Sequence, residues 1–182
     1  MIKKCLFTFV ILAGCQAPQN APFQVTDYKN TPPLFLPVGE IKTENQTVRY
    51  TELPHLETRI PVTPVSALMT ALNNRFTPKY PDTDTKVTFV IKEADLTQKI
   101  KESDHWYVLD NVEYLLTYKV DVLYTKNDDI LDQQQFSGWE KQALPQKSSL
   151  SQKERAWEKM INAMIQKTTE KIENDKPQSR TE

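Results

Sequence analysis

The stretch VEYLLTYKVDVLY, residues 112–124, is the longest run of regular alternation in this chain. The odd positions within it include the polar residues Thr117, Lys119 and Asp121. Because successive side chains of a strand point to opposite faces of the sheet, this pattern predicts a half-buried antiparallel strand. Its apolar face is formed by Tyr114, Leu116, Tyr118, Val120, Val122 and Tyr124.

The residues on either side of this stretch predict two further strands. Lys126-Asn127-Asp128-Asp129 is a polar turn cluster, so residues 130–141 should return as the second strand of a hairpin. The returning strand is polar, which favours a side that faces water or an edge of the sheet. Its predicted common face holds Leu131, Gln133, Gln135, Ser137 and Trp139. Upstream, Val87, Phe89 and Ile91 alternate with Thr88, Val90 and Lys92, and a weaker pattern over residues 38–41 suggests a short first strand.

Two amphipathic helices complete the expected elements. Thr63 is a suitable N-cap and Pro64 suits the first helical position, while Pro78 and Pro81 should end the helix. Its apolar face has helical spacing: Val65, Leu68, Met69, Leu72 and Phe76. The second helix should start at Ser151-Gln152-Lys153-Glu154, which has capping-box spacing. Its apolar face is Trp157, Met160, Ile161, Met164, Thr168 and Ile172.

These elements predict an α+β fold, a small antiparallel sheet with two amphipathic helices packed on one face. We expect a single domain over residues 38–173 and a disordered tail over residues 174–182. Residues 15–37 contain five prolines, which lack a backbone donor, and we expect them to form a flexible tether.

The N-terminus carries an export signal. Lys3 and Lys4 precede the apolar run of residues 5–12, which is too short to span a bilayer. Leu12-Ala13-Gly14-Cys15 then resembles the lipobox of bacterial lipoproteins. The resemblance implies that residues 1–14 are a lipoprotein signal peptide and that the Cys15 thiol carries a diacylglycerol. Acyl chains such as palmitate would then hold the chain on a membrane.

The location follows from the same resemblance. In Gram-negative lipoproteins an aspartate after the cysteine favours the inner membrane, and here Gln16 follows. We therefore expect the periplasmic face of the outer membrane, with the outer face of the inner membrane as the alternative.

Composition excludes several classes of function. Cleavage before Cys15 removes 14 of the 182 residues, including Cys5, so no disulfide can form in the remaining 168. It also removes Lys3 and Lys4, which leaves 21 basic against 24 acidic residues and a net charge of −3. This balance argues against nucleic-acid binding. Only Gly39 and Gly138 remain, too few for a phosphate-binding loop.

The sequence contains no recognisable catalytic, cofactor or metal motif. The only histidines, His55 and His105, are fifty residues apart and lack neighbours at metal-ligand spacing. Ser103-Asp104-His105 matches no nucleophile motif. We therefore expect no enzymatic activity and no cofactor. One aromatic set could line a groove or simply fill the core: Trp106, Tyr107, Tyr114, Tyr118, Tyr124 and Trp139.

The predicted domain resembles two groups of periplasmic lipoproteins, the lipopolysaccharide-assembly lipoprotein and the auxiliary lipoproteins of ABC-type lipid transporters. It is also similar to uncharacterised alphaproteobacterial lipoproteins, through a helix ending near Arg75, a strand like residues 89–94 and a closing helix with Glu154-Arg155-Ala156-Trp157. Our first hypothesis is a non-enzymatic lipoprotein that binds an envelope protein in outer-membrane assembly, maintenance or transport. The alternative is a carrier of lipid or a small ligand in a cavity between sheet and helices.

Overall fold

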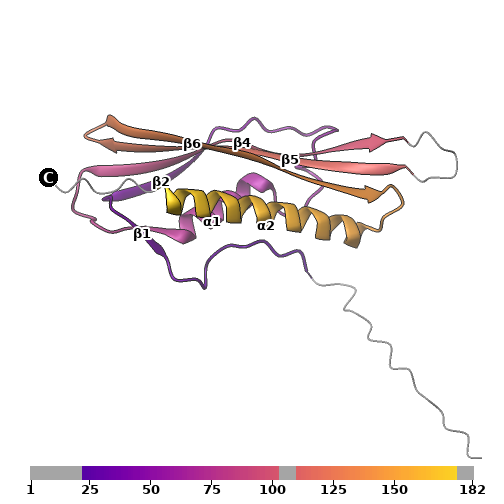
Figure 1. Ribbon diagram of the computed structural model, residues 1–182, viewed down its shortest axis with the longest axis horizontal. Coiled ribbons are helices and arrows are strands. Elements are labelled where there is room, and N and C mark those ends of the chain that lie inside the picture. Colours follow the sequence, from indigo (N-terminus) through magenta and orange to yellow (C-terminus); the bar gives the residue numbers. More distant parts are fainter. Residues whose placement is uncertain (1–21, 103–109, 176–182) are drawn as a thin grey trace, which may run out of the picture.

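Four strands form the sheet that organises the domain (Figure 1). The structure is a computed structural model and describes residues 22–102 and 110–175. The strands lie in the order β2-β4-β5-β6. They span Glu40–Asn45 (β2), Thr85–Lys101 (β4), Asn111–Lys126 (β5) and Asp129–Pro145 (β6). Strands β4 and β6 each contain 17 residues, so the sheet is long and narrow.

The sheet is mixed, which corrects the prediction of a purely antiparallel sheet. The pairs β4–β5 and β5–β6 are antiparallel, but β2 pairs with β4 in parallel. The physical reason is the connection, because the chain passes from β2 through helix α1 (Pro64–Arg75) before it enters β4. Such a crossover returns the chain to the same end of the sheet, as parallel neighbours require. A second, two-stranded parallel sheet joins β1 (Leu34–Leu36) to β3 (Phe76–Pro78).

The structure confirms the strand that the alternation over residues 112–124 predicts, which is β5. The six side chains of its predicted apolar face, from Tyr114 to Tyr124, are all buried. The predicted hairpin is also present. Asn127 and Asp128 connect β5 to β6 with φ angles of 51° and 70°. Two consecutive positive φ angles are typical of the two-residue turns that match the twist of a hairpin.

A β-bulge in β4 explains why the sequence pattern stops before the strand does. The pairing with β5 shifts register between Ile91 and Glu93, so Lys92 is the extra residue. A bulge reverses the phase of the alternation. The buried residues on the core side are therefore Val87, Phe89 and Ile91 before the bulge, and Ala94 and Leu96 after it.

Both helices lie on one face of the sheet, as predicted (Figure 1). In α1 the hydroxyl of Thr63 accepts a hydrogen bond from the Ser66 amide, and Pro64 occupies the first turn. Helix α2 (Leu150–Asn174) starts earlier than the predicted box at Ser151. Its N-cap is Ser149, whose hydroxyl accepts from the Gln152 amide while the Gln152 side chain accepts from the Ser149 amide. This arrangement is a capping box two residues before the predicted one.

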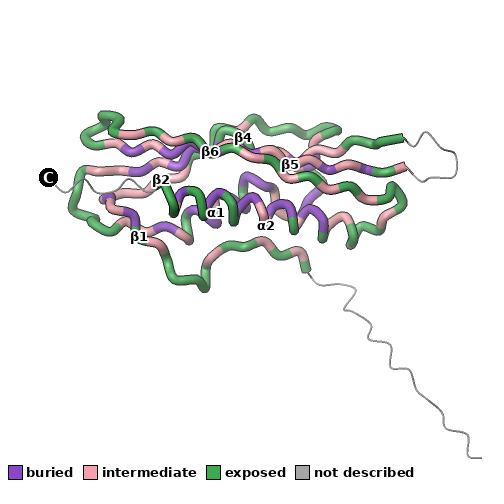
Figure 2. The backbone as a smooth tube through the Cα atoms, in the orientation of Figure 1, coloured by how far each residue is buried: buried purple, intermediate pink, exposed green. Residues whose placement is uncertain are grey.

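The core fills the space between the sheet and the helices. In Figure 2 the buried segments of β4, β5, α1 and α2 face one another across this layer. Phe89, Leu116 and Met164 are each 0 % exposed. The ring of Tyr114 meets that of Trp157 edge to face, with centroids 5.8 Å apart. The predicted apolar face of α2 is buried throughout.

The segment before β1 packs on the domain, so the predicted tether over residues 15–37 is too long at its C-terminal end. We call residues 22–33 the strap, because they run along α2 (Figure 1). The Gln24 amide donates to Glu158 over 3.2 Å and the Thr26 amide to Asn162 over 2.7 Å. Phe23, Val25 and Tyr28 pack against the core, and Leu36 is fully buried.

The strap also contacts α1. The Arg75 guanidinium donates to the carbonyl of Pro32 and lies 5.1 Å from the centre of the Tyr28 ring. The predicted domain boundaries therefore shift outward, since α2 extends to Asn174 and the strap belongs to the domain. Most of the predicted tail, residues 176–182, lies outside the described residues. Within the described ranges, neither helix combines the length and apolar character needed to cross a membrane.

Candidate functional site

The outer edge of β6 is the most extended open feature of the described sheet. β6 pairs with β5 on one side only, because it is the last strand in the order. An edge strand presents unpaired backbone N–H and C=O groups that can accept a further strand. Its outward side chains, from Gln133 to Ala143 at every second position, are exposed, and Trp139 is 64 % exposed. The predicted grouping of Gln133, Gln135, Ser137 and Trp139 on one solvent-facing side is confirmed.

A groove of about 620 Å³ runs between this edge and α2. At Gly138 the wall of the groove carries no side chain, because the Tyr118 side chain occupies the space that a Cβ atom would need. The ammonium of Lys167 on α2 is hydrogen bonded to the Glu140 carboxylate on β6. This bond raises the pKa of Lys167, and burial followed by the Glu140 charge raises the pKa of Tyr118. The groove therefore combines aromatic surface with fixed charges of both signs.

Next to this groove, a triad of charges ties three strands together through Lys141, which also lines the groove. The Glu113 carboxylate on β5 lies 2.8 Å from the Lys141 ammonium on β6 and 2.9 Å from the Lys101 ammonium on β4. Hydrogen bonds from Lys141 and then Lys101 hold the pKa of Glu113 below its usual value of 4.5. The charged form of Glu113 therefore stabilises the folded state.

Replacement of Glu113 by Gln should make stability less sensitive to acid. Because the folded-state pKa of Glu113 is lowered, its contribution is fully present above the unfolded-state pKa and is lost as the pH falls through the folded-state pKa. Urea midpoints measured from pH 7 to pH values well below 4.5 should show wild type above Glu113→Gln near neutrality, with the two converging in acid. Glu44→Gln is the control, since Glu44 is exposed and forms no ion pair among the described residues. A constant difference between wild type and Glu113→Gln at all pH values would contradict the assignment.

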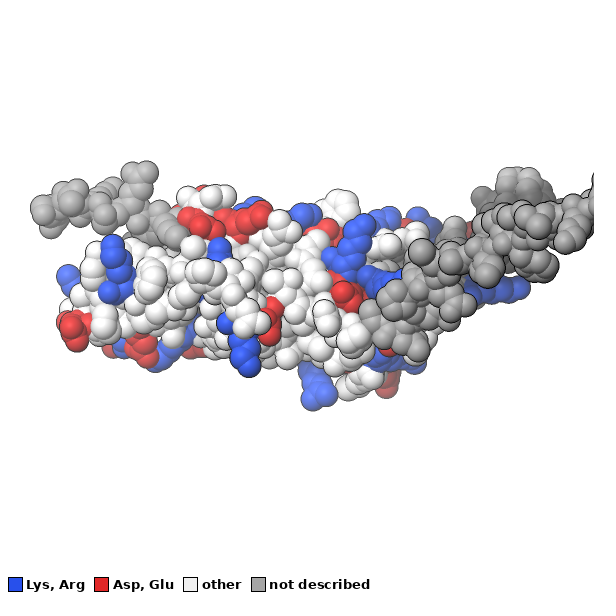
Figure 3. All heavy atoms as spheres, turned by 90° about the horizontal axis from the view of Figure 1, so that it is seen from below, with Lys and Arg blue, Asp and Glu red and all other residues white. Residues whose placement is uncertain are grey.

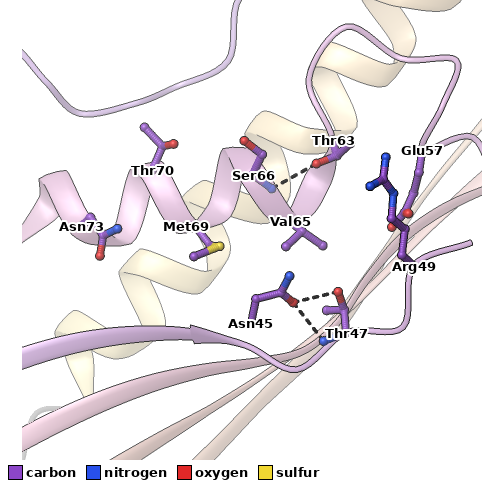
Figure 4. Close-up of a pocket in the computed structure, with 10 residues that line it drawn as sticks. All are labelled: Asn45, Thr47, Arg49, Glu57, Thr63, Val65, Ser66, Met69, Thr70 and Asn73. Atoms are coloured by element: carbon purple, nitrogen blue, oxygen red, sulfur yellow. Dashed lines mark hydrogen bonds between the residues drawn. The ribbon is translucent and has the colours of Figure 1, made fainter.

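A second groove, of about 550 Å³, separates α1 from the end of β2 and the segment that follows it (Figure 4). Val65 and Met69 extend from α1 toward Asn45 and Thr47, and form the apolar wall of the groove. The Asn45 side chain is held by the amide and hydroxyl of Thr47, over 2.9 and 2.8 Å. The remaining lining is mostly polar: Arg49, Glu57, Thr63, Ser66, Thr70 and Asn73. These groups suit hydrogen bonding and include no imidazole or thiol.

A histidine–carboxylate pair joins the outer side of β4 to the segment after β2. The Nδ1 atom of His55 lies 2.6 Å from an Asp95 carboxylate oxygen, and the Tyr50 ring stacks on the imidazole with centroids 3.9 Å apart. The other oxygen of Asp95 is buried without a partner. A carboxylate orients the imidazole in this way in many acid–base sites. Among the described residues, however, no serine, threonine or cysteine is hydrogen bonded to His55.

The pair has a clear structural role. The Leu56 amide donates to the Leu96 carbonyl and the Gln98 amide donates to the Pro54 carbonyl, both over 2.9 Å. These bonds cover the edge of β4 beyond the end of β2, and His55 fastens the same segment from the outer face. The sequence did not reveal this pair, because His55 and Asp95 are forty residues apart and His55 lies in a segment without periodicity.

The structure places the other predicted site residues as follows. Cys15, Trp106, Tyr107 and the Ser103-Asp104-His105 tripeptide lie outside the described residues. Tyr114 and Tyr124 are core residues, and burial together with Asp132 raises the pKa of Tyr124 to about 12. Tyr118, which is also buried, and the exposed Trp139 both line the groove between β6 and α2. In the described ranges, no three His, Cys, Asp or Glu side chains converge as a metal site would require.

Comparisons with known proteins leave the family open. No family model matches this sequence, and no curated protein matches it. Among solved structures, the chain is similar to a minor lipoprotein from Acinetobacter baumannii, at 12 % identity and a TM-score of 0.39, over 75 % of this chain and 92 % of that one. It is similar to uncharacterized lipoprotein B from Nitrosomonas europaea, at 15 % identity and a TM-score of 0.40, over 81 % and 88 % of the two chains.

A third similar structure is a protein from Xanthomonas campestris of the family DUF330. The identity is 10 % and the TM-score 0.37, over 81 % of this chain and 90 % of that one. Two of these three proteins are named as lipoproteins. At these identities and TM-scores, the likeness assigns neither a family nor a function.

Proposed function

We propose that this chain is a non-enzymatic lipoprotein of the bacterial envelope that binds a protein partner by strand addition to β6. Acyl chains on Cys15 anchor it to the periplasmic face of the outer membrane. The partner is an envelope protein in assembly, maintenance or transport. The observation that carries the proposal is the unpaired edge of β6, seventeen residues long, with Trp139 exposed beside it.

Strand addition suits the chemistry of this edge. Backbone hydrogen bonds supply affinity without a specific side-chain motif, and alternate side chains of the added strand contact the two faces of the sheet. On the outer face the added strand would meet Trp139, a residue type enriched where binding energy concentrates. On the inner face it would meet the groove with the Glu140–Lys167 pair, which selects polar side chains of either charge.

The packing of the core favours partner binding over the alternative of a lipid or small-ligand carrier. A carrier of that kind needs an apolar cavity of several hundred Å³ between sheet and helices. Phe89, Leu116 and Met164 occupy this layer and are fully buried. The grooves beside β2 and β6 lie at the margins of the layer.

Site-specific photo-crosslinking in intact cells tests the proposal. A photoreactive phenylalanine at position 139 should give one discrete adduct, whose partner is identified by mass spectrometry. The same group at position 80 is the matched control, since Tyr80 is an exposed aromatic residue at 47 % exposure, located away from β6 after β3. Equal adducts at both positions, or none at 139, would argue against a partner at this edge.

A second variant tests strand addition itself. Gln133→Lys with Ser137→Lys places two charges on the exposed side of β6, where added lysines discourage edge pairing. We expect the adduct at position 139 to disappear while the urea midpoint stays unchanged, because both side chains are exposed. Persistence of the adduct would show that the partner binds elsewhere on this face.

A further inference from the structure

We infer that the face formed by residues 22–36 rests on the phospholipid surface, with Phe35 in contact with the lipid. This inference rests on the proposed anchor at Cys15 and adds an orientation and a second, non-covalent contact. It arises from three features of the described residues: how firmly the strap is held, how few residues separate it from Cys15, and which side chains it exposes.

The strap is fixed to both helices along its length. Besides the Gln24 and Thr26 amide bonds, the Asn162 amide donates back to the Gln24 carbonyl over 3.2 Å. The Tyr28 hydroxyl lies 3.0 Å from that of Thr169, and the Asn74 amide donates to the Asp27 carbonyl over 2.8 Å. Residues 23–33 therefore move with the domain and do not serve as a flexible linker.

The segment between Cys15 and the strap is short compared with the domain. Seven residues lie between Cys15 and Phe23, and the eight residue steps that join these two span at most about 29 Å. The seventeen residues of β6 alone extend over roughly 56 Å. The linker joins the domain on the side of the strap, which forms the layer farthest from the sheet (Figure 1). A linker so short brings this side toward the membrane and turns the outer face of the sheet away from it.

The exposed chemistry of this face fits a lipid surface. Among residues 22–38 only Asp27 and Lys29 are charged, and their charges cancel. Figure 3, which views this side of the molecule, shows a broad and mostly uncharged surface that a few Lys, Arg, Asp and Glu side chains interrupt. Bringing an uncharged surface against a lipid surface costs far less free energy than desolvating charged side chains would.

Phe35 is the side chain best placed for insertion. Its neighbour Leu36 is fully buried, and alternation in β1 turns Phe35 away from the core, where it is 56 % exposed. β1 pairs with β3, and the chain continues from β3 to Tyr80, also exposed, with the Lys79 ammonium 5.1 Å from its ring centre. An aromatic ring beside a lysine is the combination enriched at membrane interfaces.

Fluorescence of a label at position 35 tests the contact. With Cys5 removed and Cys15 acylated, Phe35→Cys supplies the single free thiol, to which an environment-sensitive NBD group is attached. The lipidated protein is placed in vesicles of phosphatidylethanolamine and phosphatidylglycerol. We expect a blue-shifted, severalfold brighter NBD emission that spin-labelled lipids quench. Trp139→Cys, on the outer face of the sheet, is the matched control and should give the emission of an aqueous label.

The outcomes separate this inference from the proposed function. Equal, water-like emission from positions 35 and 139 in acylated protein overturns the inference and leaves the anchor intact. Tyr80→Cys repeats the test if Phe35→Cys lowers the urea midpoint. If the mass of the N-terminal peptide shows no acylation, the proposed anchor fails. The orientation is then tested by coupling the Cys15 thiol to maleimide lipid, where hydrogen exchange should slow in residues 22–36 and not in β6.

Discussion

Leu116→Ala should lower the free energy of unfolding by about 3 kcal/mol, the middle of the range for a fully buried leucine. Leu116 lies at the centre of β5 on the face toward the helices and is 0 % exposed. Truncation removes buried apolar atoms and leaves a cavity that the neighbouring strands cannot close, because β4 and β6 hold β5 on both sides. Urea denaturation of the purified protein, followed by circular dichroism, measures the loss.

The adjacent residue supplies a matched control. Leu115 has the same side chain but points to the outer face, where it is only partly buried. Leu115→Ala should therefore cost less than about 1 kcal/mol, as expected for substitutions outside the core. Equal losses at the two positions would mean that the outer face of β5 is covered in solution, contrary to the structure.

Gly39→Ala is expected to cost about 2 to 3 kcal/mol, in the upper part of the range for overpacking a close contact. A Cβ atom at this position would lie 2.0 Å from the carbonyl oxygen of Thr83. The backbone cannot easily yield, since the Gly39 amide donates to the Thr85 carbonyl over 2.8 Å and the Tyr80 amide donates to the Val38 carbonyl over 3.1 Å. The clash therefore separates the start of β2 from β4, and the urea midpoint should fall.

Gly138→Ala is the control that separates the clash at position 39 from the general effect of replacing a glycine by alanine. The atoms that a new Cβ would meet there are the hydroxyl oxygen and Cζ of Tyr118, at 2.4 and 2.5 Å. The end of a side chain can rotate away, whereas a backbone carbonyl in a hydrogen-bonded turn cannot. Gly138→Ala should therefore destabilise the domain less than Gly39→Ala. The reverse order would show that Tyr118 is held more rigidly than the turn at Thr83.

Much of the fold could be predicted because its signals are local. One face of β5 lies in the core, so the apolar residues that recur at every second position are the buried ones. The hairpin turn is visible because Asn127 and Asp128 tolerate positive φ. The face of α2 is buried where helical spacing indicates. In α1 the same spacing holds for Val65, Leu68 and Leu72, whereas Met69 is only partly buried and Phe76 belongs to β3.

The features that the sequence did not reveal depend on contacts between distant residues. The Glu40–Asn45 strand has little alternation, and its parallel pairing is set by the path of the chain through α1. The bulge at Lys92 reverses the phase of β4, so the pattern breaks within a continuous strand. The strap has a proline-rich composition typical of linkers, and only the polar groups of α2 reveal that it is bound.

The candidate site, like the fold, could be predicted from the sequence only in part. The polar character of β6 correctly indicated an exposed face at an edge, because polar side chains in a strand are mostly those in contact with solvent. The grouping of aromatic residues was less informative. Tyr114, Tyr118 and Tyr124 are all buried on one face of β5, and among them Tyr118 also reaches the groove, where it lies near the exposed Trp139. Sequence pattern alone cannot separate Tyr118 from the other two, since all three share the same face of the strand.

The pairing of the strap with α2 also sets the order in which the chain can fold. The hydrogen bonds between them join residues 134 to 141 positions apart, so the strap lacks these partners until helix α2 has left the ribosome or the translocation channel. Contacts of such long range slow folding, because the whole intervening chain must close into a loop first. A chain arrested before residue 150 lacks one wall of its core. Such a chain should remain unfolded and competent for secretion until it is almost completely synthesised.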